Sequence, residues 1–116
     1  NTGAIFDMNT SAWVKINVEN APSPRKFHTA TWSGSEMIVY GGEYFQNSIG
    51  EVFAYNPEKN TWRTINLINS KERHGHFAVW TGMEILVYGG KNRNMEPVNS
   101  LQKLNLNNTW YYYGKD

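Results

Sequence analysis

The sequence predicts an all-β fold built from repeated four-stranded antiparallel sheets. The first observation is an internal repeat, because residues 32–42 recur as residues 80–90 with every matched pair 48 positions apart. The second is the content of each copy, in which runs of strand-favouring Thr, Phe, Val, Tyr and Trp alternate with turns containing Gly and Asn. A fixed period of roughly 20 to 50 residues is typical of folds whose units pack against their neighbours.

Each full copy is predicted to contain four strands, called A to D in chain order. In the first copy a turn at Ser33 and Gly34 joins strand A to strand B, because glycine tolerates positive φ. Strand B is continuously apolar, as a strand buried on both faces is, whereas strand D alternates as a half-exposed outer strand does. The expected strands are residues 27–32, 37–40, 51–55 and 62–67 in the first copy, and 76–80, 85–88, 100–104 and a strand containing Trp110 in the second.

The opening residues resemble the second half of a copy. Residues 5–9 match residues 52–56, and residues 13–16 match the start of strand D at residues 62–65. The chain is therefore divided into an incomplete unit, holding only outer strands C and D, and two full repeats. Their predicted bounds are residues 1–18, 24–67 and 72–114.

The composition excludes several classes of protein. Of the 116 residues only 18% are charged and 15% are aromatic, which favours a packed β-rich fold over a disordered chain. The net charge of +1 does not select nucleic acid. No apolar run reaches the roughly 18 residues of a membrane helix, so membrane insertion is not expected. Because the chain has no cysteine, disulfides and cysteine nucleophiles are excluded.

The chain begins with Asn and carries no signal-peptide pattern, so we expect a mature product, an expressed segment or a fragment. A chain without cysteine is compatible with any compartment. The location therefore stays unassigned, with a secreted or extracytoplasmic one favoured.

The residues of each copy resemble the Kelch repeat. Its features are an Arg-x-x-His start, an apolar strand ending in Gly-Gly, an aromatic residue, and a Trp six or seven positions later. The matching residues are Arg25, Gly41, Gly42, Tyr55 and Trp62, then Arg73, Gly89, Gly90 and Trp110, with Phe6 and Trp13 in the opening unit and Leu104 in place of the second aromatic. The sequence around Gly-Gly resembles that of bacterial Kelch proteins.

This resemblance implies the blades of a β-propeller, with strand A lining a central channel. A closed propeller typically has about 4 to 8 blades, and about two and a half Kelch blades are predicted here. Three alternatives stay open. The chain is part of a larger propeller, several chains associate to complete a ring, or an open arc is stable by itself.

One set of candidate site residues lies at the predicted channel mouth. These residues occupy equivalent positions near the start of strand A, and they are Arg25, His28, Arg73 and His76. Arginines there could bind a carboxylate through paired hydrogen bonds. Alternatively, each arginine pairs with the backbone of a neighbouring blade or with Glu36 or Glu84.

No catalytic centre, metal or cofactor is expected. The histidines at equivalent repeat positions should diverge around the axis, and no carboxylate cluster accompanies His74. The copper chemistry of galactose oxidase, a propeller enzyme with Kelch repeats, needs a cysteine that this chain lacks. No nucleophile elbow, phosphate loop or zinc signature occurs.

The second set of candidates lies in the loops that follow each Gly-Gly. Alternating strand directions put the B–C loops and the D–A loops on one face, and these loops differ most between the copies. The segments are residues 43–50, 91–99, 19–26 and 69–72, and the recognition candidates are Tyr44, Phe45, Gln46, Arg93, Asn94 and Met95.

The repeated aromatic residues are instead expected to pack between blades. They are Trp32, Trp80, Tyr40, Tyr88, Trp62 and Trp110. We therefore predict a noncatalytic scaffold that recognises a protein partner through its B–C and D–A loops, with self-association to complete a propeller as a further contact. The alternative is part of a carbohydrate-binding or sugar-modifying propeller, similar to a sialic acid mutarotase, with its site at the channel mouth.

Overall fold

The computed structural model describes residues 2–66, 70–106 and 109–113, the last five by their backbone alone. Its elements are twelve strands among these residues, which confirms the predicted all-β fold. In the described part of the chain, no helix has the length and apolarity needed to cross a membrane.

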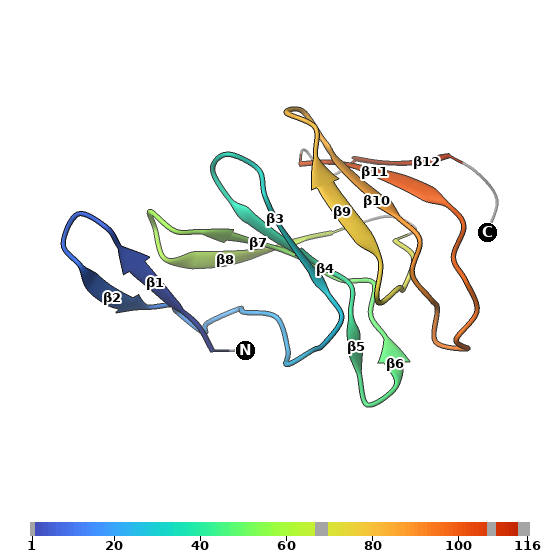
Figure 1. Cartoon of the computed structure of the whole chain (residues 1–116), viewed down its shortest axis with the longest axis horizontal. Helices are drawn as coiled ribbons and strands as arrows, with labels where there is room; N and C mark the ends of the chain where they lie inside the picture. The colour runs from blue at the N-terminus through green and yellow to red at the C-terminus, as the bar shows by residue number, and fades with distance from the viewer. Residues whose placement is uncertain (1, 67–69, 107–108, 114–116) are drawn as a thin grey trace.

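The strands form three successive antiparallel sheets and one short hairpin (Figure 1). The first sheet contains β1 (Ala4–Asp7) and β2 (Ala12–Lys15). The second contains β3 (Thr29–Trp32), β4 (Met37–Tyr40), β7 (Val52–Asn56) and β8 (Thr61–Ile65), paired in that order. The third contains β9 (Phe77–Trp80), β10 (Ile85–Tyr88), β11 (Leu101–Asn105) and β12 (Thr109–Tyr113). The two four-stranded sheets have the predicted A-B-C-D order.

The register of the first sheet differs from the sequence match. Phe6 pairs with Trp13 as Tyr55 pairs with Trp62, so β1 corresponds to residues 53–56 rather than to the stretch matched from sequence. The aromatic pair sets this register, because the Phe6 and Trp13 rings lie 5.2 Å apart. The first sheet thus holds two strands that correspond to C and D.

A short hairpin, β5 (Glu43–Tyr44) and β6 (Asn47–Ser48), occupies the segment where the sequence predicts a loop. Its two turn residues, Phe45 and Gln46, have φ of 46° and 65°. Positive φ at both positions is the geometry of a two-residue type I′ turn, which usually contains Asn-Gly or Gly. Because no such residue occurs here, the sequence did not indicate this hairpin.

The Gly-Gly pair after β4 brings the second sheet against the third. Gly41 and Gly42 have φ of 64° and 101°, and the Gly42 N–H donates to the Arg73 carbonyl at 2.9 Å. A Cβ at Gly41 would lie 2.5 Å from that same carbonyl oxygen. Only glycine allows the two backbones to approach this closely.

The hydrophobic core lies between the second and third sheets, where β3 and β9 run side by side. Its buried residues are Ile38, Tyr40, Val52, Ala54 and Ile65 from the second sheet and Ile85, Val87 and Leu104 from the third. Each sheet alone exposes one face, so the stability of both depends on this shared interface.

The repeated aromatic residues pack only where a neighbouring sheet covers them. Tyr40 is buried and Trp80 packs against the core, as predicted. The same prediction is wrong for Trp32 and Tyr88, which are 52% and 53% exposed because they face the two open ends. Trp62 is half-buried, and the predicted packing of Trp110 and the predicted strand end at Leu67 lie outside what the structure describes.

Candidate functional site

The loop face of the molecule is formed by the β5–β6 hairpin and the loop of residues 91–99, which lie at the same end of their sheets (Figure 1). The β3–β4 and β9–β10 turns lie at the opposite end (Figure 1). This arrangement follows from the alternating strand directions. The structure therefore brings the candidates of the β5–β6 hairpin and those of the loop of residues 91–99 onto one face of the molecule.

Tyr44, Phe45 and Gln46 are exposed at the tip of the β5–β6 hairpin. The ring of Phe45 is 79% exposed and meets the Tyr44 ring edge-on at 4.4 Å. The two-residue turn places the rings beside each other, so the pair presents adjoining apolar surface at the tip of the hairpin.

The second loop is closed by its own hydrogen bonds. The Asn92 Oδ1 accepts the N–H groups of Asn94 and Glu96 at 2.9 and 3.0 Å. Met95, with φ of 62°, is 58% exposed at the tip. Arg93 forms a two-pronged ion pair with Glu72, and this contact raises the pKa of the guanidinium. The loop therefore presents the apolar side chain of Met95 beside an ion pair.

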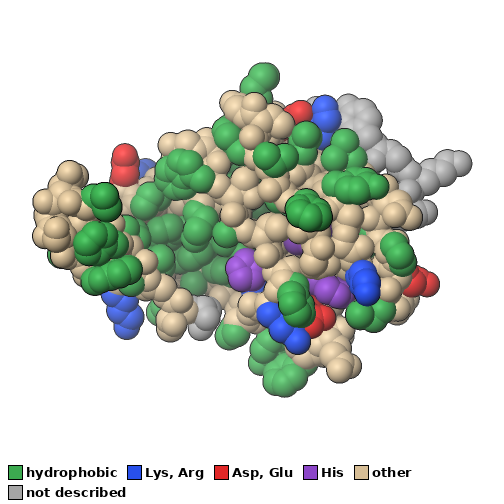
Figure 2. All heavy atoms as spheres, viewed as in Figure 1, with side chains coloured by type: hydrophobic (Ala, Val, Ile, Leu, Met, Phe, Trp, Pro, Cys, Tyr) green, Lys and Arg blue, Asp and Glu red, His purple; other side chains and the backbone are tan. Residues whose placement is uncertain are grey.

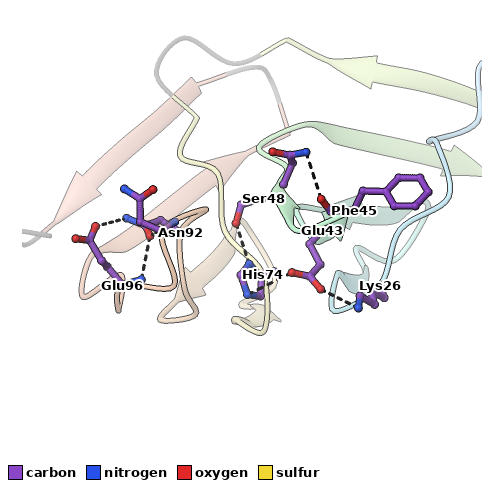
Figure 3. Close-up of polar contacts among 9 residues, drawn as sticks. Lys26, Glu43, Phe45, Ser48, His74, Asn92 and Glu96 are labelled. Carbon is purple, nitrogen blue, oxygen red and sulfur yellow. Dashed lines mark hydrogen bonds and ion pairs between the residues drawn. The ribbon is translucent and has the colours of Figure 1, made fainter.

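A buried polar cluster anchors the hairpin to the third sheet (Figure 3). Ser48 Oγ lies 2.8 Å from His74 Nδ1, and His74 Nε2 lies 3.7 Å from a Glu43 carboxylate oxygen. The other Glu43 oxygen pairs with Lys26 Nζ at 3.0 Å. The serine, histidine and glutamate are each buried, and their contacts join the hairpin to the segment that leads into β9.

Sequence reasoning missed Glu43 and Ser48 and considered His74 only as a metal ligand. Glu43 and Ser48 face each other across the β5–β6 hairpin, and His74 reaches them from the segment before β9. None of the three belongs to the repeat motif, so the spacing in the chain did not indicate them. Within the residues that the structure describes, no group of three or more His, Asp or Glu side chains is placed to hold a metal ion.

The channel-mouth arginines bond to carbonyls within their own sheets. Arg73 is fully buried, and its guanidinium donates to the carbonyls of Gly89 and Ser100 at 3.0 and 3.2 Å and to Ser100 Oγ at 3.0 Å. Arg25 donates to the Gly41 carbonyl at 3.2 Å and to Glu51 at 2.9 Å. In both repeats the acceptor is the first glycine of Gly-Gly.

Both carboxylates named as alternative partners pair elsewhere. Glu36 forms a two-pronged pair with Arg63, and Glu84 lies 3.2 Å from Lys103 Nζ. The Arg73 guanidinium points into the protein, so it offers no exposed donors for a ligand carboxylate.

The two histidines of the motif occupy different environments. His76 is buried, its Nε2 lies 2.8 Å from Thr29 Oγ1, and its ring lies 4.9 Å from that of Tyr40. Burial, followed by the charge of Arg73, lowers the pKa of His76 to about 4. His28 is exposed on the side of the second sheet that faces Ile16.

Comparisons with known proteins agree with this geometry. A family model described as the KLHDC2/KLHL20/DRC7 Kelch-repeats domain matches residues 1–113. The chain is also similar to a Ras guanine nucleotide exchange factor F from Dictyostelium discoideum, with 36% identity over 70 residues. That match covers 57% of this chain and 6% of the relative. The bacterial character expected from the sequence stays a prediction.

Proposed function

The chain belongs to the Kelch-repeat family, and from this premise we propose that it is a noncatalytic module that recognises a protein partner through its loop face. A Kelch-repeat domain supports a role in protein–protein interaction. The loop face is the surface where the repeats diverge, whereas repeated residues such as Tyr40 and Arg73 are buried.

The observation that carries this proposal is the exposed pair of adjoining rings of Tyr44 and Phe45. Large aromatic side chains provide most of the binding energy in many protein interfaces. Met95 offers a second apolar contact on the same face, and the Arg93–Glu72 pair supplies polar groups at its rim. A partner with an apolar pocket and a polar border fits this surface.

The channel-mouth alternative has less support. A sugar carboxylate site there would require Arg73 and His76 to face the ligand, and both side chains are buried in the interface between sheets.

The test is affinity capture from an extract of cells that express the protein, followed by quantitative mass spectrometry. The variant Tyr44→Ala/Phe45→Ala/Arg93→Ala is expected to lose at least about tenfold of a captured partner, because each aromatic anchor contributes on the order of 2 kcal/mol. Its melting temperature should stay within about 2 °C of the parent, since all three side chains are exposed.

The matched control is Met8→Ala/Met83→Ala, which removes exposed apolar side chains from turns away from the loop face. This control should retain the partner. Equal capture by the loop variant and the parent would refute the proposal, and so would equal losses with the control variant.

A further inference from the structure

Arg73 is a buried cation that has no carboxylate partner among the described residues. Its side chain is fully buried, and its guanidinium donates to the carbonyls of Gly89 and Ser100 and to the Ser100 hydroxyl. Elsewhere, Figure 2 shows Lys and Arg side chains beside Asp and Glu side chains at several places on the surface. A buried charge normally lies against an opposite charge, because burial removes the water that would stabilise it.

The equivalent arginine of the second sheet has the carboxylate that Arg73 lacks. Arg25 Nη2 lies 2.9 Å from a Glu51 carboxylate oxygen. Ser100 stands at the position of Glu51, since each directly precedes the third strand of its sheet, β7 or β11. The Ser100 hydroxyl accepts a hydrogen bond from Arg73 at 3.0 Å but carries no charge. One negative charge of this arrangement is therefore missing from the third sheet.

A second replacement makes the surroundings of the guanidinium more polar and less crowded. In the second sheet the Phe53 ring lies 5.2 Å from the Arg25 guanidinium carbon. Gln102 stands at the position of Phe53, because Phe53 pairs with Val39 as Gln102 pairs with Val87. An amide side chain is slightly smaller than a phenyl ring and carries N–H donors. The third sheet thus has a little more room and an additional donor beside its arginine.

Three buried nitrogen atoms of this region have no hydrogen-bond partner among the described residues. They are Arg73 Nε, Gln102 Nε2 and His76 Nδ1, and all three side chains are more than nine-tenths buried. The Gln102 amide oxygen accepts from the Tyr40 hydroxyl at 2.9 Å, and the Tyr40 ring lies 4.9 Å from that of His76. The three unpartnered atoms therefore lie around one end of the interface between the two four-stranded sheets.

All three atoms can donate a hydrogen bond at once. Arg73 Nε and Gln102 Nε2 always carry hydrogen. The His76 imidazole is neutral at pH 7, because burial and then the charge of Arg73 lower its pKa to about 4. When His76 Nε2 accepts from the Thr29 hydroxyl, 2.8 Å away, the ring proton lies on Nδ1. A group that accepts from all three donors and carries negative charge would satisfy the whole region.

We propose that this region is a binding site for a small monovalent anion, chloride, held by the N–H groups of Arg73 Nε, Gln102 Nε2 and His76 Nδ1. The anion supplies to Arg73 the charge that Glu51 supplies to Arg25. The exchange of a phenyl ring for an amide leaves room for a single-atom ion rather than for a phosphate or a carboxylate. A water molecule accepts the same hydrogen bonds but leaves the charge of Arg73 unbalanced, which favours the anion.

The first test measures the melting temperature as sodium chloride replaces sodium gluconate at constant ionic strength. Gluconate is the matched salt, because its anion is too large for a buried single-ion site. An anion that binds only the folded chain raises the melting temperature, by about 4 to 7 °C when it is about tenfold above its dissociation constant. The rise should follow the logarithm of the chloride concentration. Equal melting temperatures in the two salts would overturn the proposal.

Two variants that restore the residues of the second sheet separate ion binding from a general salt effect. Ser100→Glu gives Arg73 a carboxylate of its own, and Gln102→Phe fills the space beside the guanidinium. Both should lose most of the chloride response, whatever their own stability. The matched control is Glu36→Gln, which removes a carboxylate paired with Arg63 in the second sheet and should keep the response of the parent. A full chloride response in Ser100→Glu and Gln102→Phe would contradict the assignment.

The position of the ion can be observed directly in a crystal grown in sodium bromide, because bromide scatters anomalously and replaces chloride. We expect an anomalous peak within hydrogen-bond distance of Arg73, Gln102 and His76. This measurement needs no variant, so it decides the question even where a substitution prevents folding. Water at that position, or bromide bound only at the surface, would overturn the proposal.

Discussion

At the scale of the residue, His76 shows how burial changes the chemistry of a repeated side chain. Its ring lies between Thr29 and Tyr40, and burial, together with the charge of Arg73, lowers its pKa to about 4. The imidazole is therefore neutral at pH 7. In this position it acts as a packing and hydrogen-bonding group between two sheets.

This depressed pKa predicts that stability falls as the pH drops from about 6.5 toward 4. In the unfolded chain His76 binds a proton near an ordinary pKa of about 6.5, whereas the folded chain excludes that proton until about pH 4. The unfolded state binds more protons in this window, so it is stabilised relative to the folded state, by up to about 3 kcal/mol at the lower end of the pH range. Urea unfolding at several pH values measures the slope.

The variant His76→Gln isolates this contribution, because it keeps a polar group beside Thr29 and does not titrate. Its stability should vary less with pH between 6.5 and 4 than that of the parent. His28→Gln, at the exposed equivalent position, should retain most of the parent's slope. The hypothesis fails if the slope is unchanged in His76→Gln.

At the scale of the element, the Gly-Gly turns set how closely the strands approach. Gly42 and Gly82 have nearly the same φ, 101° and 99°, but different surroundings. A Cβ on Gly42 would lie 2.9 Å from the Lys26 carbonyl oxygen, whereas a Cβ on Gly82 would meet nothing within 4 Å. The two positions therefore separate backbone strain from steric overlap.

Gly42→Ala is predicted to destabilise the protein more than Gly82→Ala. Both variants lose about 1 to 2 kcal/mol of folding free energy because alanine is strained in a left-handed conformation. Only Gly42→Ala also creates a steric overlap, which costs about 1 to 3 kcal/mol more. Denaturant midpoints of the two variants and the parent give the difference directly. Equal losses of stability in the two variants would show that the backbone near Gly42 shifts to accommodate the Cβ at no cost in free energy.

The strands could be predicted because their apolar runs and turns repeat, and the pairing order followed from that repeat. The β5–β6 hairpin could not, because Phe45 and Gln46 adopt positive φ without glycine. The register predicted for β1 was wrong, because the sequence match relied on a short apolar stretch rather than on the Phe6–Trp13 pair. The loop candidates were placed on one face from sequence alone, but the burial of Arg73 depends on contacts that no local pattern records.

At the scale of the whole molecule, the described residues form one core between the two four-stranded sheets, and side chains on the far face of the third sheet are exposed. Residues at the same repeat position therefore differ in energetic role. Tyr40 is 2% exposed and bonds across the interface to Gln102, whereas Tyr88 is 53% exposed on the far face of the third sheet. The open face there also includes Phe77 and Val79, where the second sheet carries Thr29 and Thr31.

This asymmetry predicts that Tyr40→Ala costs about 3 to 5 kcal/mol of folding free energy, whereas Tyr88→Ala changes it by less than about 0.5 kcal/mol. The first variant leaves a cavity in the core and removes the partner of Gln102, and the second removes an exposed ring. Urea unfolding should be measured at two protein concentrations at least tenfold apart. If Tyr88→Ala destabilises the chain only at the higher concentration, the open face of the third sheet is covered by another copy, and Tyr88 would contribute to an interface between chains.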